Sequence, residues 1–362
     1  VVLAMSSFKN PVDESKIPED YKKKTKFQSV FVDLSLKIFP ALYCFIFFKS
    51  YHAFRFKNTE FSRKIIEILS ENEFDIVLCE TVFMTHYVDI LRKYSNASLV
   101  LRTHNVEHLI WYRIAKETVN PFKKLYLYHL AYTLKKYELF SFGKYGAIAS
   151  ISNKDTEILK SLGCKTKIVD IPFGINISQY VYNKIGFPIK FFHIGAMNWI
   201  PNQKGIIWFI ENVWKKFAEK HDNQLFLAGR SMPETFFELS CKGLNVTGEV
   251  ENAIEFISKH EVMIVPIFSG SGIRVKIIEA MALGRIVVTT SIGAEGLNCA
   301  DKKNIFIADN SDEFLKVLDY LVNSDSEMLN TISLNARKLI ETEHNNRLSI
   351  DRLKDLFVSL SN

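Results

Sequence analysis

The chain has 362 residues, of which 48% are apolar and 24% are charged, and its formal net charge is +6. This composition is typical of a folded globular protein and excludes disordered and fibrous classes, and the length is sufficient for two domains. No apolar run reaches the roughly 18 residues that a membrane span needs. The five scattered cysteines form no CxxC pair and no secretory leader is visible, so we expect a reduced, cytoplasmic protein. Neither a basic helix nor an aromatic RNA-binding motif is present, so nucleic acid is not an expected partner.

The first half of the chain alternates apolar strands with helical stretches. Strands are expected at residues 1–5, 30–34, 76–79, 99–103, 147–151 and 167–171, and the clearest helices at residues 61–70, 83–94 and 122–142. Strands that alternate with helices predict a parallel sheet covered by helices on both faces.

Two segments between the first strands bear on membrane contact. The basic run YKKKTK at residues 21–26 is interpreted as a solvated surface loop, with contact to a membrane surface or an anionic substrate as the functional alternative. The apolar run IFPALYCFIFF at residues 38–48 is interpreted as a buried or interfacial helix, with monotopic membrane contact as the alternative. The sequence therefore leaves open a peripheral contact with the inner face of the cell membrane.

The alternation restarts after residue 183. Strands are expected at residues 191–194, 224–228, 244–247, 262–266 and 286–289, with a helix at residues 203–220 and two closing helices within residues 326–360. Prolines and glycines between residues 172 and 188 mark a boundary. We expect one domain at residues 1–172, a second at residues 173–345, and a helix at residues 346–362 that packs back toward the first domain. The predicted fold class is α/β, with two doubly wound, Rossmann-like domains facing a cleft.

The most informative segment is PIFSGSGIRVKIIEAMALGRIVVTT at residues 266–290. A strand leads into a loop with Gly270 and Gly272, and a helix follows with Arg274 and Lys276 in its first turn. Glycines at such a turn let backbone amides approach a ligand, and the start of a helix favours negative charge. Glu279 lies seven residues after Gly272, on roughly the same helix face, where it can accept hydrogen bonds from sugar hydroxyls. This combination suits a nucleotide-sugar, although an ordinary βα turn has the same outline.

Other strand ends in the second half carry residues suited to a phosphate or a sugar. Gly195 and Lys204 follow one strand, and Arg230 follows another directly after a glycine. The glycine-flanked loop GAEGL places Glu295 after a third strand. Each cation can neutralise a phosphate or remain a solvated surface residue, and both interpretations stay open.

The first half contains HNVEH, from His104 to His108, which matches the HxxEH zinc-peptidase motif. That chemistry needs both histidines on one face of a helix. The apolar strand SLVLRT leads directly into His104, so we expect His104 to end the strand and only His108 to enter the helix. A zinc site is therefore disfavoured, and no metal is expected.

Three segments resemble retaining glycosyltransferases of the family-four type, which have the GT-B fold: GSGIRVKIIEAMALGRIVVTTSIGAEGL, LRTHNVEHLIW and IPFGINISQY. The resemblance implies that His104 lies in the cleft near the donor sugar, and that the turn around Val250 reads the nucleobase through its backbone. The family often has a glutamate seven residues before the position of Glu279, where this chain has Ser271. It also usually opens with a strand, a glycine-rich turn and a helix that we do not find before the first strand, so we expect that this unit is missing.

We therefore expect an enzyme that moves a sugar from a nucleotide-diphosphate donor to a glycan or lipid-linked acceptor with retained configuration, in surface polysaccharide biosynthesis. Arg274, Lys276 and the amides at the helix start are expected to stabilise the leaving diphosphate without a metal, and no cofactor is expected. The resemblance implies a front-face substitution, with His104 among the catalytic residues. The alternatives are a non-catalytic nucleotide-sugar-binding module and a sugar-nucleotide epimerase of the same fold.

Overall fold

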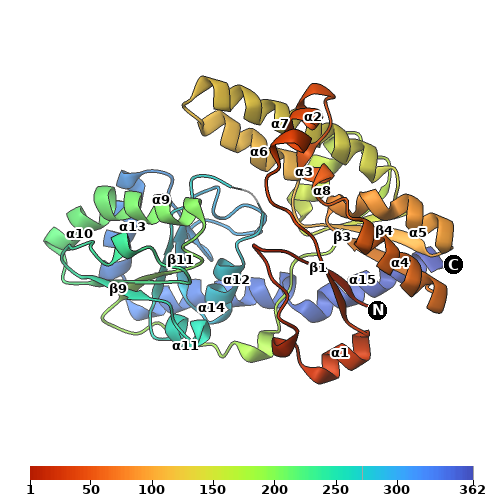
Figure 1. Cartoon of the computed structure of the whole chain (residues 1–362). Helices are drawn as coiled ribbons and strands as arrows, with labels where there is room; N and C mark the ends of the chain where they lie inside the picture. Colours follow the sequence, from red (N-terminus) through yellow and green to blue (C-terminus); the bar gives the residue numbers. More distant parts are fainter. Residues whose placement is uncertain (271, 362) are drawn as a thin grey trace. The chain divides into compact units, whose positions relative to one another are not determined.

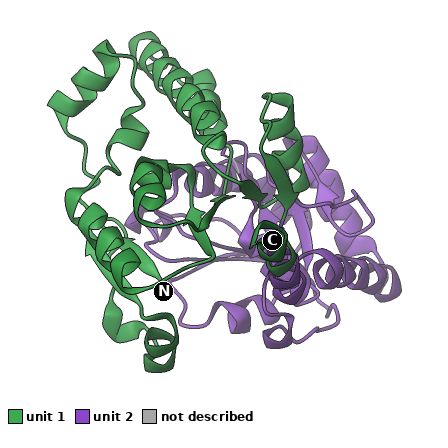
Figure 2. Cartoon of the chain, turned by 90° about the vertical axis from the view of Figure 1, so that its right-hand side faces the viewer, with its two compact units in different colours: residues 1–170, 354–362 green, residues 171–353 purple. Residues whose placement is uncertain are grey.

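The computed structural model describes residues 1–270 and 272–361 (Figure 1). The chain divides into two compact units, coloured separately in Figure 2. Unit 1 comprises residues 1–170 and 354–362, and unit 2 comprises residues 171–353. Among the residues that the structure describes, no helix is both long and apolar enough to cross a bilayer.

Unit 1 is built on parallel strands. Strands β1 (Leu3–Ser6) and β2 (Gln28–Phe31) pair with each other, and a separate sheet has the order β3 (Ile76–Glu80), β4 (Ser98–Thr103), β5 (Ala147–Ser150) and β6 (Lys167–Asp170). The α-helices of this unit are α1 (Glu19–Thr25), α2 (Ile38–Ile46), α3 (Tyr51–Phe54), α4 (Thr59–Glu71), α5 (Val88–Tyr94), α6 (Glu107–Glu117), α7 (Pro121–Phe142) and α8 (Asn153–Ser161), together with the end of α15 (Asn346–Ser361). The absence of a first strand-turn-helix unit stays a prediction.

Local chemistry explains where these helices begin. The Asn58 side chain accepts a hydrogen bond from the Phe61 amide at 2.8 Å, which satisfies one of the amides left open at the start of α4. Residues Phe61, Ile65 and Ile68 then follow at helical spacing and bury one face of α4. Helix α7 begins in the same way after Asn120, with a proline at its first position.

The loop predicted at residues 21–26 was wrong, and so was the buried alternative for the helix at residues 38–48. Residues 21–26 do not form a loop, because most of them belong to α1, where Lys22 and Lys24 make ion pairs with acidic residues one turn earlier. Residues 38–46 do form the predicted helix, α2, but its apolar side chains are mostly exposed and only Cys44 is buried. Burial therefore does not explain the apolar sequence of α2.

Unit 2 contains a parallel sheet in the order β12-β11-β10-β7-β8-β9. The strands are β7 (Lys190–Ile194), β8 (Gln224–Ala228), β9 (Leu244–Gly248), β10 (Val262–Val265), β11 (Ile286–Thr289) and β12 (Phe306–Ile307). The α-helices are α9 (Ile200–Phe209), α10 (Lys215–Lys220), α11 (Ala253–Ser258), α12 (Val275–Ala282), α13 (Ser311–Asn323), α14 (Ser326–Glu343) and the first half of α15. A wider π turn over Ile210–Trp214 joins α9 to α10, so the predicted helix at residues 203–220 is continuous but irregular.

The sheet of unit 2 is buried on both faces. Along β10, Val262 and Ile264 belong to one hydrophobic cluster, whereas Met263 and Val265 belong to another. Successive strand residues point to opposite faces, so the two clusters lie on opposite sides of the sheet. One cluster includes residues of α9, α10 and α13, and the other includes residues of α11, α12 and α14. The sheet therefore holds α9 and α12 on opposite faces, close to the ends of the same strands.

Helix α9 approaches the end of β10 at Gly205. A Cβ atom at this position would lie 1.9 Å from the carbonyl oxygen of Pro266, the residue that follows the strand. A backbone oxygen cannot be displaced without moving the strand end, so Gly205 fixes how closely α9 can pack there.

We expect Gly205→Ala to destabilise unit 2 by about 1–3 kcal/mol, because the added methyl group overlaps backbone. Urea unfolding followed by tryptophan fluorescence measures this, since Trp199, Trp208 and Trp214 all lie in unit 2. Gly186→Ala is the control, because its Cβ would meet only the tip of the Glu261 side chain, at 3.3 Å. Equal unfolding midpoints for the two variants would contradict this account of the packing.

Candidate active site

The candidate site of unit 2 lies where three neighbouring strands end. The sheet places β7 between β10 and β8, and all three run parallel, so their C-terminal ends share one edge. Gly195 follows β7 and Gly229 follows β8, and a Cβ atom at Gly229 would lie 1.9 Å from the Gly195 carbonyl oxygen. A side chain at residue 229 would block this backbone approach. Gly229 also has a positive φ of 155°, which favours glycine independently.

The ammonium group of Lys276 is the centre of this edge. Its Nζ atom lies 2.8 Å from Asn202 Oδ1 on α9 and 3.4 Å from His193 Nε2 on β7. A Cβ atom at Gly195 would lie only 3.0 Å from the same Nζ atom. The side chain from α12 thus reaches across the strand ends toward α9, and the glycine provides the room for it.

Hydrogen bonds fix the amide orientation of Asn202 and the tautomer of His193, the two partners of Lys276. Asn202 donates from Nδ2 to the Ala196 carbonyl at 2.9 Å, which turns its Oδ1 oxygen toward the ammonium. Since a carbonyl can only accept, Nδ1 of His193 must donate to the Ile264 carbonyl, 2.7 Å away. Burial and the nearby charge of Lys276 lower the pKa of His193 well below its ordinary value, so the ring is neutral. Its Nε2 lone pair therefore faces Lys276.

The charge of Lys276 is held in a poorly hydrated position. Desolvation, followed by the nearby charge of Arg274, lowers the pKa of Lys276 to about 7. Among the residues that the structure describes, the groups that hold the ammonium are a neutral histidine and an amide oxygen. A negatively charged group that binds here would favour the protonated amine.

Arg274 lies immediately before α12 and is buried. Its Nη1 atom donates to the Gly272 carbonyl at 2.8 Å, and its guanidinium stacks over the Trp199 ring with 5.4 Å between the guanidinium carbon and the ring centroid. A Cβ atom at Gly270 would lie 3.1 Å from that ring. Arg274 and Lys276 therefore place two cations at the start of one helix. Ser271, where the resembled family often has its first glutamate, lies outside the described residues.

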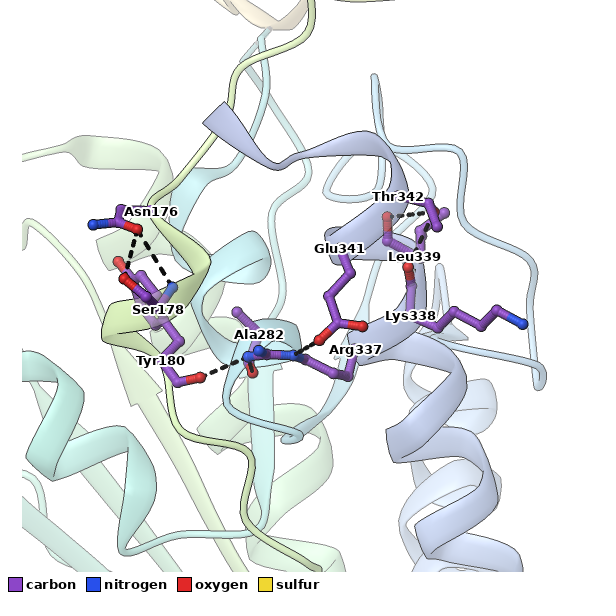
Figure 3. Close-up of polar contacts among 9 residues, drawn as sticks. All are labelled: Asn176, Ser178, Tyr180, Ala282, Arg337, Lys338, Leu339, Glu341 and Thr342. Carbon is purple, nitrogen blue, oxygen red and sulfur yellow. Dashed lines mark hydrogen bonds and ion pairs between the residues drawn. The ribbon is translucent and has the colours of Figure 1, made fainter. Parts of the chain in front are cut away.

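Glu279 lies one turn after Lys276 on α12 and is half-buried. It accepts a hydrogen bond from the Tyr180 hydroxyl at 3.0 Å, and burial raises the pKa of its carboxyl group above the usual range. Figure 3 shows how Tyr180 is held, with Arg337 of α14 donating to its carbonyl oxygen at 2.7 Å. The same guanidinium also donates to the Ala282 carbonyl at the end of α12 and bonds Glu341 at 2.6 Å. Arg337 thus fixes both the tyrosine and the helix that carries Glu279.

The remaining predicted residues of unit 2 occupy varied positions. Lys204 is exposed on α9, two residues after Asn202 and so on a different side of that helix. Arg230 is also exposed, and its carbonyl accepts a hydrogen bond from the Met197 amide at 2.8 Å. Val250 packs against the hydrophobic cluster that contains Met263 and Val265 of β10. Glu295 is half-buried in the loop after β11. Asn202, rather than Lys204, is the α9 side chain in contact with Lys276.

In unit 1, the HNVEH segment has the predicted course. Strand β4 ends at Thr103 and α6 begins at Glu107, so His104 lies before the helix. His104 Nε2 is 2.6 Å from Glu80 Oε2, whereas His108 Nδ1 is 2.5 Å from Glu138 Oε2. The two histidines have different carboxylate partners, which is not the arrangement of a shared zinc ion.

Glu138 organises the start of α6 from inside the protein. This α7 residue is buried, and its carboxylate accepts hydrogen bonds from the amides of Glu107 and His108 at 2.9 and 3.1 Å. Helix-start amides and the His108 ring together offset the cost of burying the carboxylate. Burial, together with the charge of Glu138, raises the pKa of Glu107 to about 7.

Sequence reasoning missed His193, Asn202, Tyr180 and Arg337 as parts of the site. Both Asn202 and His193 lie within HIGAMNWIPNQKG. The available signal was His193, a polar residue inside an apolar strand. Arg337 gave no local signal for this role, because the two carbonyls that it holds lie more than 50 residues away in sequence.

Comparison with known proteins places this geometry in context. Residues 188–324 match the family model for glycosyl transferases group 1. A Klebsiella pneumoniae protein described as an "uncharacterized 44.6 kDa protein in cps region" is 25% identical over 303 residues, which covers 78% of this chain and 74% of the relative.

Solved structures share the fold at low sequence identity. Anabaena HepE in complex with UDP-glucose is 13% identical with a TM-score of 0.64, covering 98% of both chains. A glycosyltransferase from Rickettsia africae is 15% identical with a TM-score of 0.64, covering 99% of this chain and 97% of the other. Sucrose-phosphate synthase from Thermosynechococcus elongatus is 15% identical with a TM-score of 0.64, covering 83% and 78%.

The chain is a glycosyltransferase of the GT-B fold. The predicted α/β fold class and the prediction of an enzyme that transfers a sugar are therefore confirmed. The roles of the individual site residues stay predictions.

Proposed function

We propose that this glycosyltransferase binds a nucleotide-diphosphate sugar in unit 2 and transfers the sugar with retention of configuration. The observation that carries the proposal is the desolvated ammonium of Lys276, held by Asn202 and a neutral His193 at the strand ends. Two of its N–H groups are directed at these protein atoms, and the third is assigned to a phosphate oxygen. A diphosphate supplies the negative charge that the pocket lacks.

The leaving diphosphate needs positive charge as the glycosidic bond breaks. Lys276 lies in the first turn of α12 and Arg274 directly before it, where the helix-start amides add a partial positive charge. We assign both side chains to the phosphates, with Gly272 letting the backbone approach them. Under this assignment the protein itself stabilises the charge, and transfer proceeds without a bound metal.

The rest of the donor is assigned along the same edge. Glu279, half-buried and already accepting a hydrogen bond from Tyr180, is placed on the ribose hydroxyls. The backbone around Val250 is assigned to the nucleobase, and Gly195, Gly270, Lys204, Arg230 and Glu295 to the rim of the donor site. The binding of UDP and UDP-glucose by Anabaena HepE supports a nucleotide-sugar donor and makes UDP-sugars the first donors to test.

Retention follows from the family resemblance in the sequence. We infer a front-face substitution in which the leaving phosphate helps to deprotonate the acceptor, with His104 at the reacting sugar. The contact between His104 and Glu80 orients the ring. A glycan or lipid-linked acceptor in surface polysaccharide biosynthesis is proposed, supported by the name of the Klebsiella relative, which places it in a cps region.

Glu279→Gln should weaken UDP binding by roughly tenfold or more, because a carboxylate that accepts from ligand hydroxyls contributes about 1.5–3 kcal/mol per charged hydrogen bond. Isothermal titration measures the change, and thermal unfolding verifies the fold. The control is Glu255→Gln, which changes an exposed carboxylate of α11 in the same unit. An unchanged dissociation constant for Glu279→Gln would remove this residue from the donor site.

UDP binding should take up a proton at Lys276. The free amine has a pKa of about 7, and a bound phosphate raises that pKa, so above neutrality the complex holds more protons than the free protein. Affinity should therefore fall as the pH rises from about 7 to about 9, by up to tenfold per pH unit.

Calorimetry in buffers of different ionisation enthalpy measures this proton uptake directly. Lys276→Arg is the matched variant, because a guanidinium stays charged throughout this range. The UDP affinity of Lys276→Arg should be nearly independent of pH. Any proton uptake that comes from titration of UDP itself should appear equally in the variant and in the unsubstituted chain. The same proton uptake in Lys276→Arg would show that another group is responsible.

The function itself is tested by donor hydrolysis and transfer. We expect the protein to release sugar from one of a panel of UDP-, GDP- and ADP-sugars, and NMR at early times should show the anomeric configuration of the donor in the product. His104→Asn should lower turnover by about 100-fold or more while leaving UDP affinity unchanged. The control is His221→Asn, at a partly exposed histidine of unit 2 that pairs with Asp319. Product of inverted configuration would overturn the proposed stereochemistry, and a panel without turnover or nucleotide binding would overturn the function.

A further inference from the structure

Unit 1 presents a group of large apolar side chains to solvent, on α2 and around the turn between α6 and α7. Figure 1 shows these helices beside one another, near the α2 and α7 labels. We call this group the aromatic patch, and its most exposed members are Ile38, Phe39, Phe48, Val119, Phe122 and Leu125. Phe39 is 86% exposed, Phe122 84% and Val119 96%. Single exposed apolar residues are ordinary, but a contiguous set of this size marks an interaction surface.

The two helices that carry the aromatic patch, α2 and α7, are in direct contact. The Phe45 ring lies 4.5 Å from the His129 ring and 6.1 Å from the Tyr126 ring, measured between centroids, so α2 packs directly on α7. Beneath this contact a small buried cluster joins α2, α3, α6 and α7 through Cys44, Tyr51, Ala115, Leu127 and Leu130. The helices therefore have a core of their own, and the exposed side chains lie outside it.

The backbone at the end of α2 also favours exposure of an aromatic ring. Phe48 has a φ of 50°, a left-handed conformation that is rare and strained for a bulky residue. Its ring is 61% exposed and lies 5.0 Å from the His129 ring. Strain of this kind persists where the surrounding structure imposes it, and here it places one more phenylalanine in the patch.

Cations outnumber carboxylates around the aromatic patch. Residues 37–57 contain Lys37, Lys49, Arg55 and Lys57 and no acidic residue, although Lys37 pairs with Asp33 at 3.0 Å. Residues 116–136 contain five lysines, and Glu117 is their only acidic residue. Lys49, Lys116 and Lys123 are exposed. Apolar rings with cations on their borders match a bilayer whose headgroups are anionic and whose interior is apolar.

We propose that the aromatic patch docks unit 1 on the surface of an anionic lipid bilayer, with the rings of α2 and of the α6–α7 turn entering the headgroup region. The lysines that border it contact the lipid phosphates. We assign docking to the aromatic patch rather than to the basic run of α1, where two of the four lysines, Lys22 and Lys24, pair with acidic residues on their own helix. The inference deepens the proposed function, because a lipid-linked acceptor is then presented at the same surface, but docking and donor binding are measured separately.

The test uses the full chain and vesicles of phosphatidylcholine with or without phosphatidylglycerol, at low and high salt. We expect co-sedimentation with the phosphatidylglycerol vesicles that salt weakens. Phe39→Ser combined with Phe122→Ser should lower the partition coefficient by roughly tenfold or more, because each exposed ring removed loses apolar contact with lipid. Lys49→Gln combined with Lys123→Gln should lower it by roughly fivefold per lysine on anionic vesicles alone.

Phe8→Ser is the matched control, because Phe8 is 78% exposed in the same unit but lies outside the aromatic patch. Its partition coefficient should equal that of the unsubstituted chain, and all variants should keep their circular dichroism and their UDP affinity. Background sedimentation of the unsubstituted chain at low salt would overturn the proposal, as would equal binding by the phenylalanine variant. A vesicle-independent dimer that Phe39→Ser dissociates, without vesicle binding, would assign the patch to a second copy of the chain instead. Vesicle binding without any UDP binding would retain the docking surface and overturn only the donor assignment.

Discussion

The site of unit 2 depends on one constraint, the positioning of a desolvated ammonium group between two neutral partners. Asn202 and a neutral His193 hold Lys276 through an amide oxygen and an imidazole lone pair, and the resulting desolvation lowers the pKa of the amine to about 7. The glycine at residue 195 and the close packing of α9 at Gly205 both serve this geometry, because side chains there would overlap the ammonium or the strand end. The fold thus holds a desolvated amine whose protonated form a bound anion would favour.

The α6–α7 helix pair connects two features of unit 1, the segment that follows His104 and the aromatic patch. At one end, buried Glu138 accepts the first amides of α6 and fixes the segment that follows His104. At the other end, the turn between the helices carries Val119 and Phe122 of the aromatic patch. One rigid helix pair therefore supports both the histidine assigned to the reacting sugar and the surface proposed to contact lipid.

Much of the fold follows from local patterns in the sequence. Among the described residues of unit 2, five strands were predicted to within one or two residues, because short β-branched and aromatic runs bounded by glycine or proline have few other stable forms. The short β12 was missed. The course of HNVEH was also predictable, since an apolar strand leads directly into His104. Of the two alternatives for residues 38–48, a buried or an interfacial helix, the exposed side chains exclude the buried one. An apolar composition favours burial of such a run, but the tertiary packing of the neighbouring helices decides whether its side chains are buried.

By itself, the sequence determined the alternating α/β order, the glycine-rich turn before α12 and the cations and carboxylate on that helix, because these depend on spacing within a few residues. Only the tertiary structure decided which distant groups meet them. Lys276 contacts Asn202 from 74 positions earlier, and Glu279 contacts Tyr180 from 99 positions earlier. Such contacts follow from the order of strands in the sheet and from the close approach of helices and strands at glycines, and no local sequence pattern encodes them. The protonation of Lys276 belongs to the same level, since it depends on the burial that those contacts create.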